Sequence, residues 1–183
     1  LLGLSMSKLP ASETFPLGVT APKLIFAAVL TMAGAIVLLS EGDNLMRSIF
    51  LPPQWLVQIF EELTSGEQGL WGSFLALVVV APLTEEFLFR GLILNGFLQR
   101  YSKWSAILLS SFLFAAFHFN PWQFIGAFAL GALFAWLYVQ TRSLFLPLLG
   151  HALNNALPLI LSNVDIKISG FSTEIGETLE FQP

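Results

Sequence analysis

The sequence contains no cysteine among its 183 residues. That absence excludes disulfide bonds, a thiol nucleophile and zinc sites built from cysteine. Charge is also scarce, because 11% of the residues are Asp, Glu, Lys or Arg, whereas a soluble domain carries roughly 25%. Hydrophobic residues make up 55% of the chain, and no basic patch suggests a nucleic-acid partner. These proportions predict an integral membrane protein with one domain.

Five apolar runs are long enough to be considered as membrane helices, at residues 24–40, 70–99, 104–119, 122–139 and 144–161. The predicted fold class is therefore all-α, a polytopic membrane helix bundle of about five spans. Between the first two runs, "PPQWLVQIFEEL" places Trp55, Ile59 and Leu63 four residues apart, which predicts an interfacial amphipathic helix. In the fourth run, Ala127, Gly131 and Ala135 form a small-residue face that favours close helix packing.

Three parts of the chain are expected. Residues 1–69 hold the first span, an acidic loop and the amphipathic helix; residues 70–162 form the membrane core that carries the chemistry; residues 163–183 are an acidic tail expected to be mobile.

If the spans alternate across the membrane, one side receives most of the basic residues, namely Lys8, Lys23, Arg100, Lys103 and Arg142. The positive-inside tendency then predicts a cytoplasmic amino terminus in a multi-pass protein, with a bacterial plasma membrane as the expected location.

Ionisable residues lie inside the second apolar run, in "APLTEEFLFRG" at residues 81–91. Each such residue at a helix centre costs about 2.5–3.5 kcal/mol on insertion scales. Glu86 and Arg90 are four residues apart, so they meet on one helix face and are expected to form a structural salt bridge. Glu85 lies about 100° around the helix from Glu86 and has no such partner. A second carboxylate in an apolar span marks a candidate functional site.

Other polar residues occur in separate spans. His118 ends "FLFAAFH", and His151 opens "HALNN", in which Asn155 lies one turn later and Asn154 lies beside it. Polar groups within a bilayer must face each other or a water-filled cavity. We therefore expect Glu85, His118, His151 and Asn155 to converge.

Several kinds of catalytic site can be excluded or left open on these residues. The sequence has no nucleophile elbow and no H-E-x-x-H motif, and its only aspartates, Asp43 and Asp165, lie outside the spans. The remaining set suits the activation of water by a carboxylate with a histidine, and the stabilisation of an oxyanion by a histidine and an amide. No cofactor is required for that chemistry. Zinc or another divalent metal held by Glu85, His118 and His151 is the alternative left open.

Three motifs together resemble a known family. "EEFLFR" matches E-E-x-x-x-R, "FAAFH" matches F-x-x-x-H and "HALNN" matches H-x-x-x-N. In this order the sequence is similar to the CPBP family of intramembrane glutamic endopeptidases, which includes type II CAAX prenyl endopeptidases and relatives linked to bacteriocin processing or self-immunity. The resemblance covers roughly residues 70–160.

The resemblance implies a bundle of membrane helices with a cavity open to one side, and it implies roles for particular residues. Glu85 would activate water with His118, and His151 and Asn155 would stabilise the oxyanion. Glu86 and Arg90 would support the site, and Phe114 would pack beside His118. The implied partners are the lipid bilayer and a membrane-anchored protein or peptide substrate. The alternative is a non-proteolytic membrane protein, either a proton-coupled transporter or an immunity or scaffold subunit.

Overall fold

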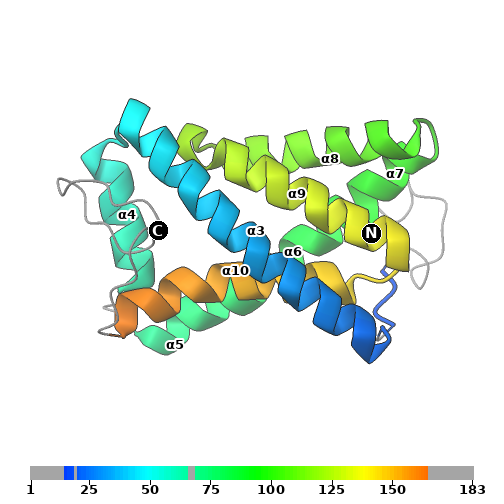
Figure 1. Ribbon diagram of the computed structural model, residues 1–183, viewed down its shortest axis with the longest axis horizontal. Coiled ribbons are helices and arrows are strands. Elements are labelled where there is room, and N and C mark those ends of the chain that lie inside the picture. The colour runs from blue at the N-terminus through cyan, green and yellow to red at the C-terminus, as the bar shows by residue number, and fades with distance from the viewer. Residues whose placement is uncertain (1–14, 19, 66–68, 165–183) are drawn as a thin grey trace.

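The computed structural model describes residues 15–18, 20–65 and 69–164. Every regular element in that part of the chain is helical (Figure 1). The helices are, in order, α3 (Pro22–Ile49), α4 (Gln54–Thr64), α5 (Leu70–Ser73), η1 (Phe74–Val80), α6 (Ala81–Glu86), η2 (Phe87–Leu94), α7 (Asn95–Leu98), α8 (Lys103–Phe117), α9 (Pro121–Thr141) and α10 (Phe145–Asn163). The all-helical bundle predicted from the sequence is confirmed. Residues 1–14 and 165–183, which include Lys8 and most of the expected tail, lie outside the described residues.

The elements from α5 to α7 form one continuous helix of 29 residues, Leu70–Leu98. Its turns widen to the π-helical form in η1 and again in η2, on either side of α6. In η1 the N–H of Ala81 donates to Ala76, five residues earlier. The next bond in that register would join Leu77 to Pro82, which has no N–H. The carbonyl of Leu77 is therefore left for a partner outside its own helix.

Four described helices have the length and composition to cross a membrane: α3, Leu70–Leu98, α9 and α10. The protein is a multi-pass integral membrane protein. The remaining predicted span, 104–119, corresponds to helix α8. Its 15 residues extend about 22 Å, which is shorter than the hydrocarbon core of roughly 30 Å. The first helix is longer than the predicted span 24–40, because it continues to Ile49 through a turn in which Arg47 pairs with Asp43 at 2.6 Å.

The predicted amphipathic helix is α4. It lies across one end of the bundle, whereas the longer helices run along it (Figure 1). Leu56 on α4 is buried, and Trp55, Ile59 and Leu63 are exposed. The side chain of Asn163, at the end of α10, donates to the carbonyl of Thr64 at 2.7 Å and so joins α4 to the bundle.

The small-residue face on α9 packs closely against α8. Ala127 and Ala135 are buried. A Cβ atom added to Gly131 would lie 3.1 Å from Cδ1 of Phe114 and 3.3 Å from Cα of Ser111, so no larger residue fits without displacing α8. The packing role predicted for this face is confirmed.

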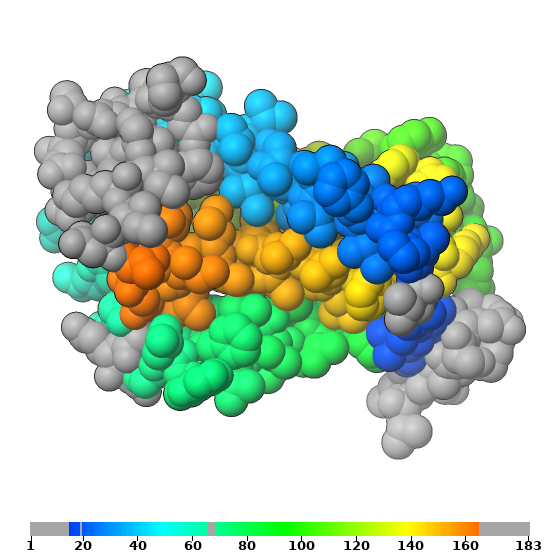
Figure 2. All heavy atoms as spheres, turned by 60° about the horizontal axis from the view of Figure 1, so that its bottom comes forward, coloured from blue at the N-terminus to red at the C-terminus, as the bar shows by residue number. Residues whose placement is uncertain are grey.

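Helix α10 lies between two other long helices. In the space-filling view it runs through the middle, with α3 on one side and the helix Leu70–Leu98 on the other (Figure 2). Because α10 carries "HALNN" and the helix Leu70–Leu98 carries "EEFLFR", this arrangement brings two of the three motifs together.

Candidate active site

The carboxylate of Glu85 lies between the two histidines. Its Oε2 atom is 4.0 Å from Nε2 of His118 and 3.9 Å from Nε2 of His151. These separations are too long for direct hydrogen bonds, and Oε2 is buried without a hydrogen-bond partner among the described residues. Three helices, α6, α8 and α10, thus deliver three polar groups to one place. The predicted convergence of these three residues is confirmed.

Glu86 and Arg90 form the predicted ion pair, and both side chains are fully buried beside the site. Nη1 of Arg90 donates to Oε1 of Glu86 at 3.0 Å, and Nη2 donates to the carbonyl of Gly131 at 2.9 Å. The guanidinium carbon is 4.5 Å from the ring centre of Phe114 and 5.5 Å from that of Phe134. A charge held by hydrogen bonds and two aromatic faces is stabilised without water. The structural salt bridge expected from the spacing is confirmed.

Glu86 has a second contact that the spacing did not reveal. Its Oε1 atom lies 2.9 Å from Nδ1 of His151. A carboxylate accepts, so Nδ1 carries the hydrogen and donates. Nε2, the other ring nitrogen, faces Glu85 and carries a hydrogen only if the imidazole is doubly protonated. Phe134 stacks on the same imidazole at 5.5 Å between ring centres. Phe134 follows Gly131 by three residues, so helical spacing alone could have placed it on this face.

His118 is oriented by its own helix. Its Nδ1 atom lies 2.8 Å from the carbonyl oxygen of Phe114, one turn earlier. A carbonyl only accepts, so Nδ1 carries the hydrogen and Nε2 faces Glu85 as an acceptor. The ring of Phe114 meets the edges of His118 and of His151 at 4.9 and 5.8 Å between centres. Phe114 therefore packs beside both imidazoles, as the resemblance implies for His118.

The two asparagines lie one turn beyond His151. Nδ2 of Asn155 donates to the carbonyl of Leu77 at 2.9 Å, which is the carbonyl that Pro82 leaves without a backbone donor. Nδ2 of Asn154 donates to Oδ1 of Asn155 at 3.3 Å. Asn155 is thus fixed in position, and its amide group retains one further N–H.

A cavity of about 200 Å³ adjoins this cluster. Its lining includes His118, His151, Asn154, Asn155 and Phe114, together with residues of α3 and α9. A cavity of this size, with several polar side chains in an otherwise apolar wall, has room for several water molecules. The two histidines and the asparagines therefore meet solvent space next to Glu85, which agrees with the one-sided cavity implied by the resemblance.

The two serines in the core do not form a nucleophilic site. Ser110 and Ser111 are buried, and their hydroxyls donate to the carbonyls of Phe89 and Ile107, so neither lies beside a base.

The spacing of the polar atoms can also be compared with that of a zinc site. Ligand atoms on one tetrahedral zinc lie roughly 3.3 Å apart, given bonds of about 2.0–2.2 Å. The separations of 3.9 and 4.0 Å at Glu85 exceed this. Within residues 15–18, 20–65 and 69–164, no three His, Cys, Asp or Glu side chains form a metal-binding group.

The comparison with known families matches the segment that carries all three motifs. Residues 67–157 match the family model described as type II CAAX prenyl endopeptidase Rce1-like. These residues belong to the Rce1-like family. No solved structure matches the chain significantly.

Three curated proteins are similar to this chain. An uncharacterized 24.3 kDa protein of Escherichia coli is 30% identical over 127 residues, which cover 66% of this chain and 58% of that protein. A putative membrane peptidase, YdiL of Bacillus subtilis, is 29% identical over 83 residues, which cover 45% of this chain and 34% of that protein. CAAX prenyl protease 2 of Caenorhabditis elegans is 31% identical over 105 residues, which cover 46% of this chain and 40% of that protein. The matches thus span between about a third and three fifths of the length of these relatives.

Proposed function

We propose that this protein is an intramembrane endopeptidase that hydrolyses a peptide bond of a membrane-associated protein or peptide. The observation that carries the proposal is the position of the buried Glu85 carboxylate, 4.0 and 3.9 Å from the Nε2 atoms of His118 and His151. A single water with hydrogen bonds of about 2.8 Å to both atoms of either pair spans such a gap. The Rce1-like match and the peptidase names of two relatives support this reaction class.

In the proposed mechanism, Glu85 is the general base. The neutral His118 offers a lone pair from Nε2, since its Nδ1 donates to Phe114. A water between Glu85 and His118 would donate one hydrogen to each, which directs its own lone pair toward the substrate carbonyl. Glu85 takes the proton as the water attacks, and the proton passes to the leaving amine as the C–N bond breaks.

His151 and Asn155 would stabilise the oxyanion. Because Nδ1 of His151 donates to Glu86, donation from Nε2 requires the doubly protonated imidazolium. Glu86 is placed to stabilise that cation, as the carboxylate of a catalytic triad does. Asn155 has one amide N–H on Leu77, and its other N–H is available to the oxyanion. Glu86 is in this scheme a positioning residue as well as a structural one.

The proposal needs neither an acyl-enzyme nor a metal. The chain has no cysteine, and the hydroxyls of Ser110 and Ser111 donate to backbone carbonyls.

We also propose that the substrate is anchored in the membrane, as in CAAX-type or bacteriocin- and immunity-type processing. The bacterial relatives support a bacterial plasma membrane as the location.

The test is cleavage of a library of membrane peptides by the purified protein in proteoliposomes. Each peptide carries an apolar segment of about 20 residues and a quenched fluorophore pair. Wild type should cleave part of the library, and Glu85→Gln should lose about 10²–10⁴-fold in rate. Glu62→Gln is the matched control, because Glu62 is an exposed carboxylate on α4, and it should cleave like wild type. Equal cleavage by Glu85→Gln and wild type would refute the mechanism, and no cleavage by wild type would favour a non-proteolytic membrane protein.

A further inference from the structure

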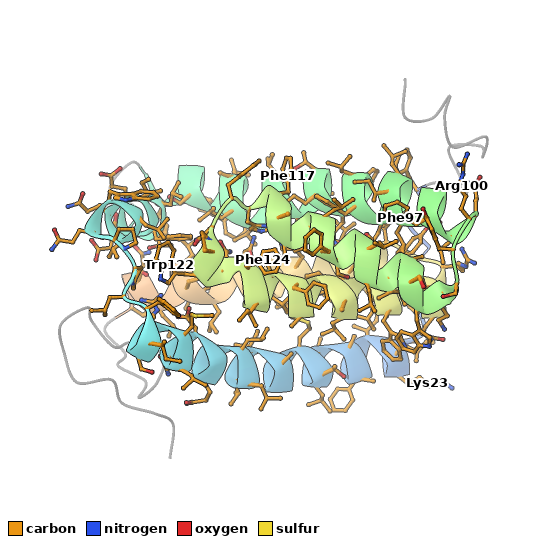
Figure 3. The ribbon with its side chains drawn as sticks, turned by 90° about the horizontal axis from the view of Figure 1, so that it is seen from above. Lys23, Phe97, Arg100, Phe117, Trp122 and Phe124 are labelled. Carbon is orange, nitrogen blue, oxygen red and sulfur yellow. The ribbon has the colours of Figure 1, made fainter. Side chains whose placement is uncertain are left out.

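The two ends of the bundle carry different charges. Lys23 is the second residue of α3, Arg100 lies between α7 and α8, Lys103 begins α8, and Arg142 follows α9. The antiparallel helices bring these positions to one end, where Lys23 and Arg100 are seen in Figure 3, while α4 lies at the other end. Of the described Lys and Arg residues at helix ends, Arg47 alone is near α4, and it pairs with Asp43.

The catalytic cavity lies toward the α4 end. Besides His118, His151 and Asn155, its lining includes Asp43 of α3 and Trp122 and Gln123 at the start of α9. A larger cavity of about 590 Å³, bordered by α4 through Leu56, Val57 and other residues, is lined by the same three. Trp122 is seen toward the α4 side in Figure 3, and its indole N–H donates to the carbonyl of Phe50 at 2.9 Å, just before α4. The two cavities share these three lining residues, so the α4 end provides a route to His118 and His151, which lie beside Glu85.

Which side of the membrane this end faces follows from the basic residues. Short loops rich in Lys and Arg remain in the cytoplasm, and the count of basic residues decides the orientation. Here the basic end is the one without α4. The α4 end, and with it the route to the active site, is then placed on the opposite side.

We infer that the active site is reached from the side of the membrane opposite the cytoplasm, through the α4 cavity. The inference rests on the proposed peptidase function for its consequence, which is a restriction on the substrate. The scissile bond belongs to a polypeptide segment that is presented outside the cytoplasm, such as an exported peptide or the outer flank of a membrane anchor. Gln123, exposed at the border of both cavities, would then lie beside the path of the substrate.

The absence of cysteine makes the orientation directly measurable. Gln58→Cys places one thiol on the exposed surface of α4, and Ser102→Cys places one at the basic end, where Ser102 is also exposed. In intact bacterial cells with a permeabilised outer membrane, a membrane-impermeant maleimide should label the first variant and spare the second. Both should be labelled after detergent treatment. Labelling of Ser102→Cys in intact cells, or failure to label Gln58→Cys there when detergent exposes it, would overturn the inference.

A second measurement concerns the route itself. In right-side-out membrane vesicles, a bulky impermeant maleimide added outside should block cleavage of a library peptide by Gln123→Cys. The cysteine-free parent and Ser102→Cys should continue to cleave under the same treatment. Cleavage by Gln123→Cys that persists although its thiol is modified would overturn the route while leaving the proposed function intact. If no variant cleaves any peptide, the proposed function fails, yet the labelling of Gln58→Cys and Ser102→Cys still decides the orientation.

Discussion

The imidazole of His151 faces two consecutive carboxylates of another helix. Its Nδ1 atom lies 2.9 Å from Glu86, and its Nε2 atom lies 3.9 Å from Glu85. Glu85 and Glu86 therefore differ in what they contact although they are neighbours in sequence. Glu86 is fully buried with Arg90 and His151, whereas the side chain of Glu85 is 22% exposed.

Glu86→Gln should lower thermal stability in detergent more than Glu85→Gln does. The substitution leaves the Arg90 guanidinium buried without its anion, which costs about 3–5 kcal/mol. Circular dichroism melts of the two variants give the comparison. Equal melting temperatures would contradict the structural role assigned to Glu86 and not to Glu85.

The double variant Glu86→Gln/Arg90→Met separates the two roles of Glu86. Removing the stranded cation along with its partner should restore much of the melting temperature. Peptide cleavage should remain impaired, since Nδ1 of His151 has lost the carboxylate that orients it. If stability and cleavage recover together, Glu86 acts through the salt bridge alone.

Asn155→Ala should reduce cleavage about 10²–10³-fold if the amide donates to the oxyanion. It also removes the partner of the Leu77 carbonyl, with a stability cost of about 1–3 kcal/mol. In a Pro82→Ala background, a backbone N–H is available to Leu77, so the stability cost of Asn155→Ala should shrink while its catalytic cost persists. Melting temperatures and rates of the four proteins form a double-mutant cycle. A cycle with no coupling in stability would contradict the link between Pro82 and Asn155.

Gly131→Ala should destabilise the protein by about 1–3 kcal/mol through overpacking. The added methyl group meets the backbone of Ser111 and the ring of Phe114, so it also shifts the ring that touches both imidazoles, and cleavage should fall. Gly34→Ala in α3 is the matched control, because nothing lies within 4 Å of the added atom. It should melt at or slightly above the wild-type temperature, since alanine favours helix. Thermal melts that fail to separate the two variants would contradict the close α8–α9 packing.

Chelators and serine-directed reagents should leave peptide cleavage unchanged. The proposed mechanism uses a water beside Glu85 and no metal, and Ser110 and Ser111 face backbone carbonyls. Metal analysis of the active, purified protein accompanies the assay. Stoichiometric zinc lost in parallel with activity would reassign Glu85, His118 and His151 as ligands.

The sequence allowed the helical class, the ion pair and the convergence of Glu85 with the histidines to be predicted. Each of these follows from local spacing or from the cost of polar groups in lipid. The contact between His151 and Glu86 could not be predicted, because it depends on how α10 is rotated against α6. The partner of Asn155 could not be predicted either. Pro82 indicates that one backbone carbonyl lacks a donor, but the sequence does not say which one. The π-helical register of η1 leaves the carbonyl of Leu77, rather than that of Val78, without a backbone donor.

Arg90 couples assembly of the bundle to assembly of the site. Its guanidinium is held by Glu86 on its own helix and by the Gly131 carbonyl on α9, and through Glu86 it is joined to His151 on α10. If α9 slid along its neighbours by one residue, Gly131 would leave Nη2 and a charge would lose a partner inside the membrane. The register seen in the structure keeps both hydrogen bonds of the guanidinium together with the contact between Glu86 and His151. A bundle packed in another register would therefore lose stability together with the contacts that form the site.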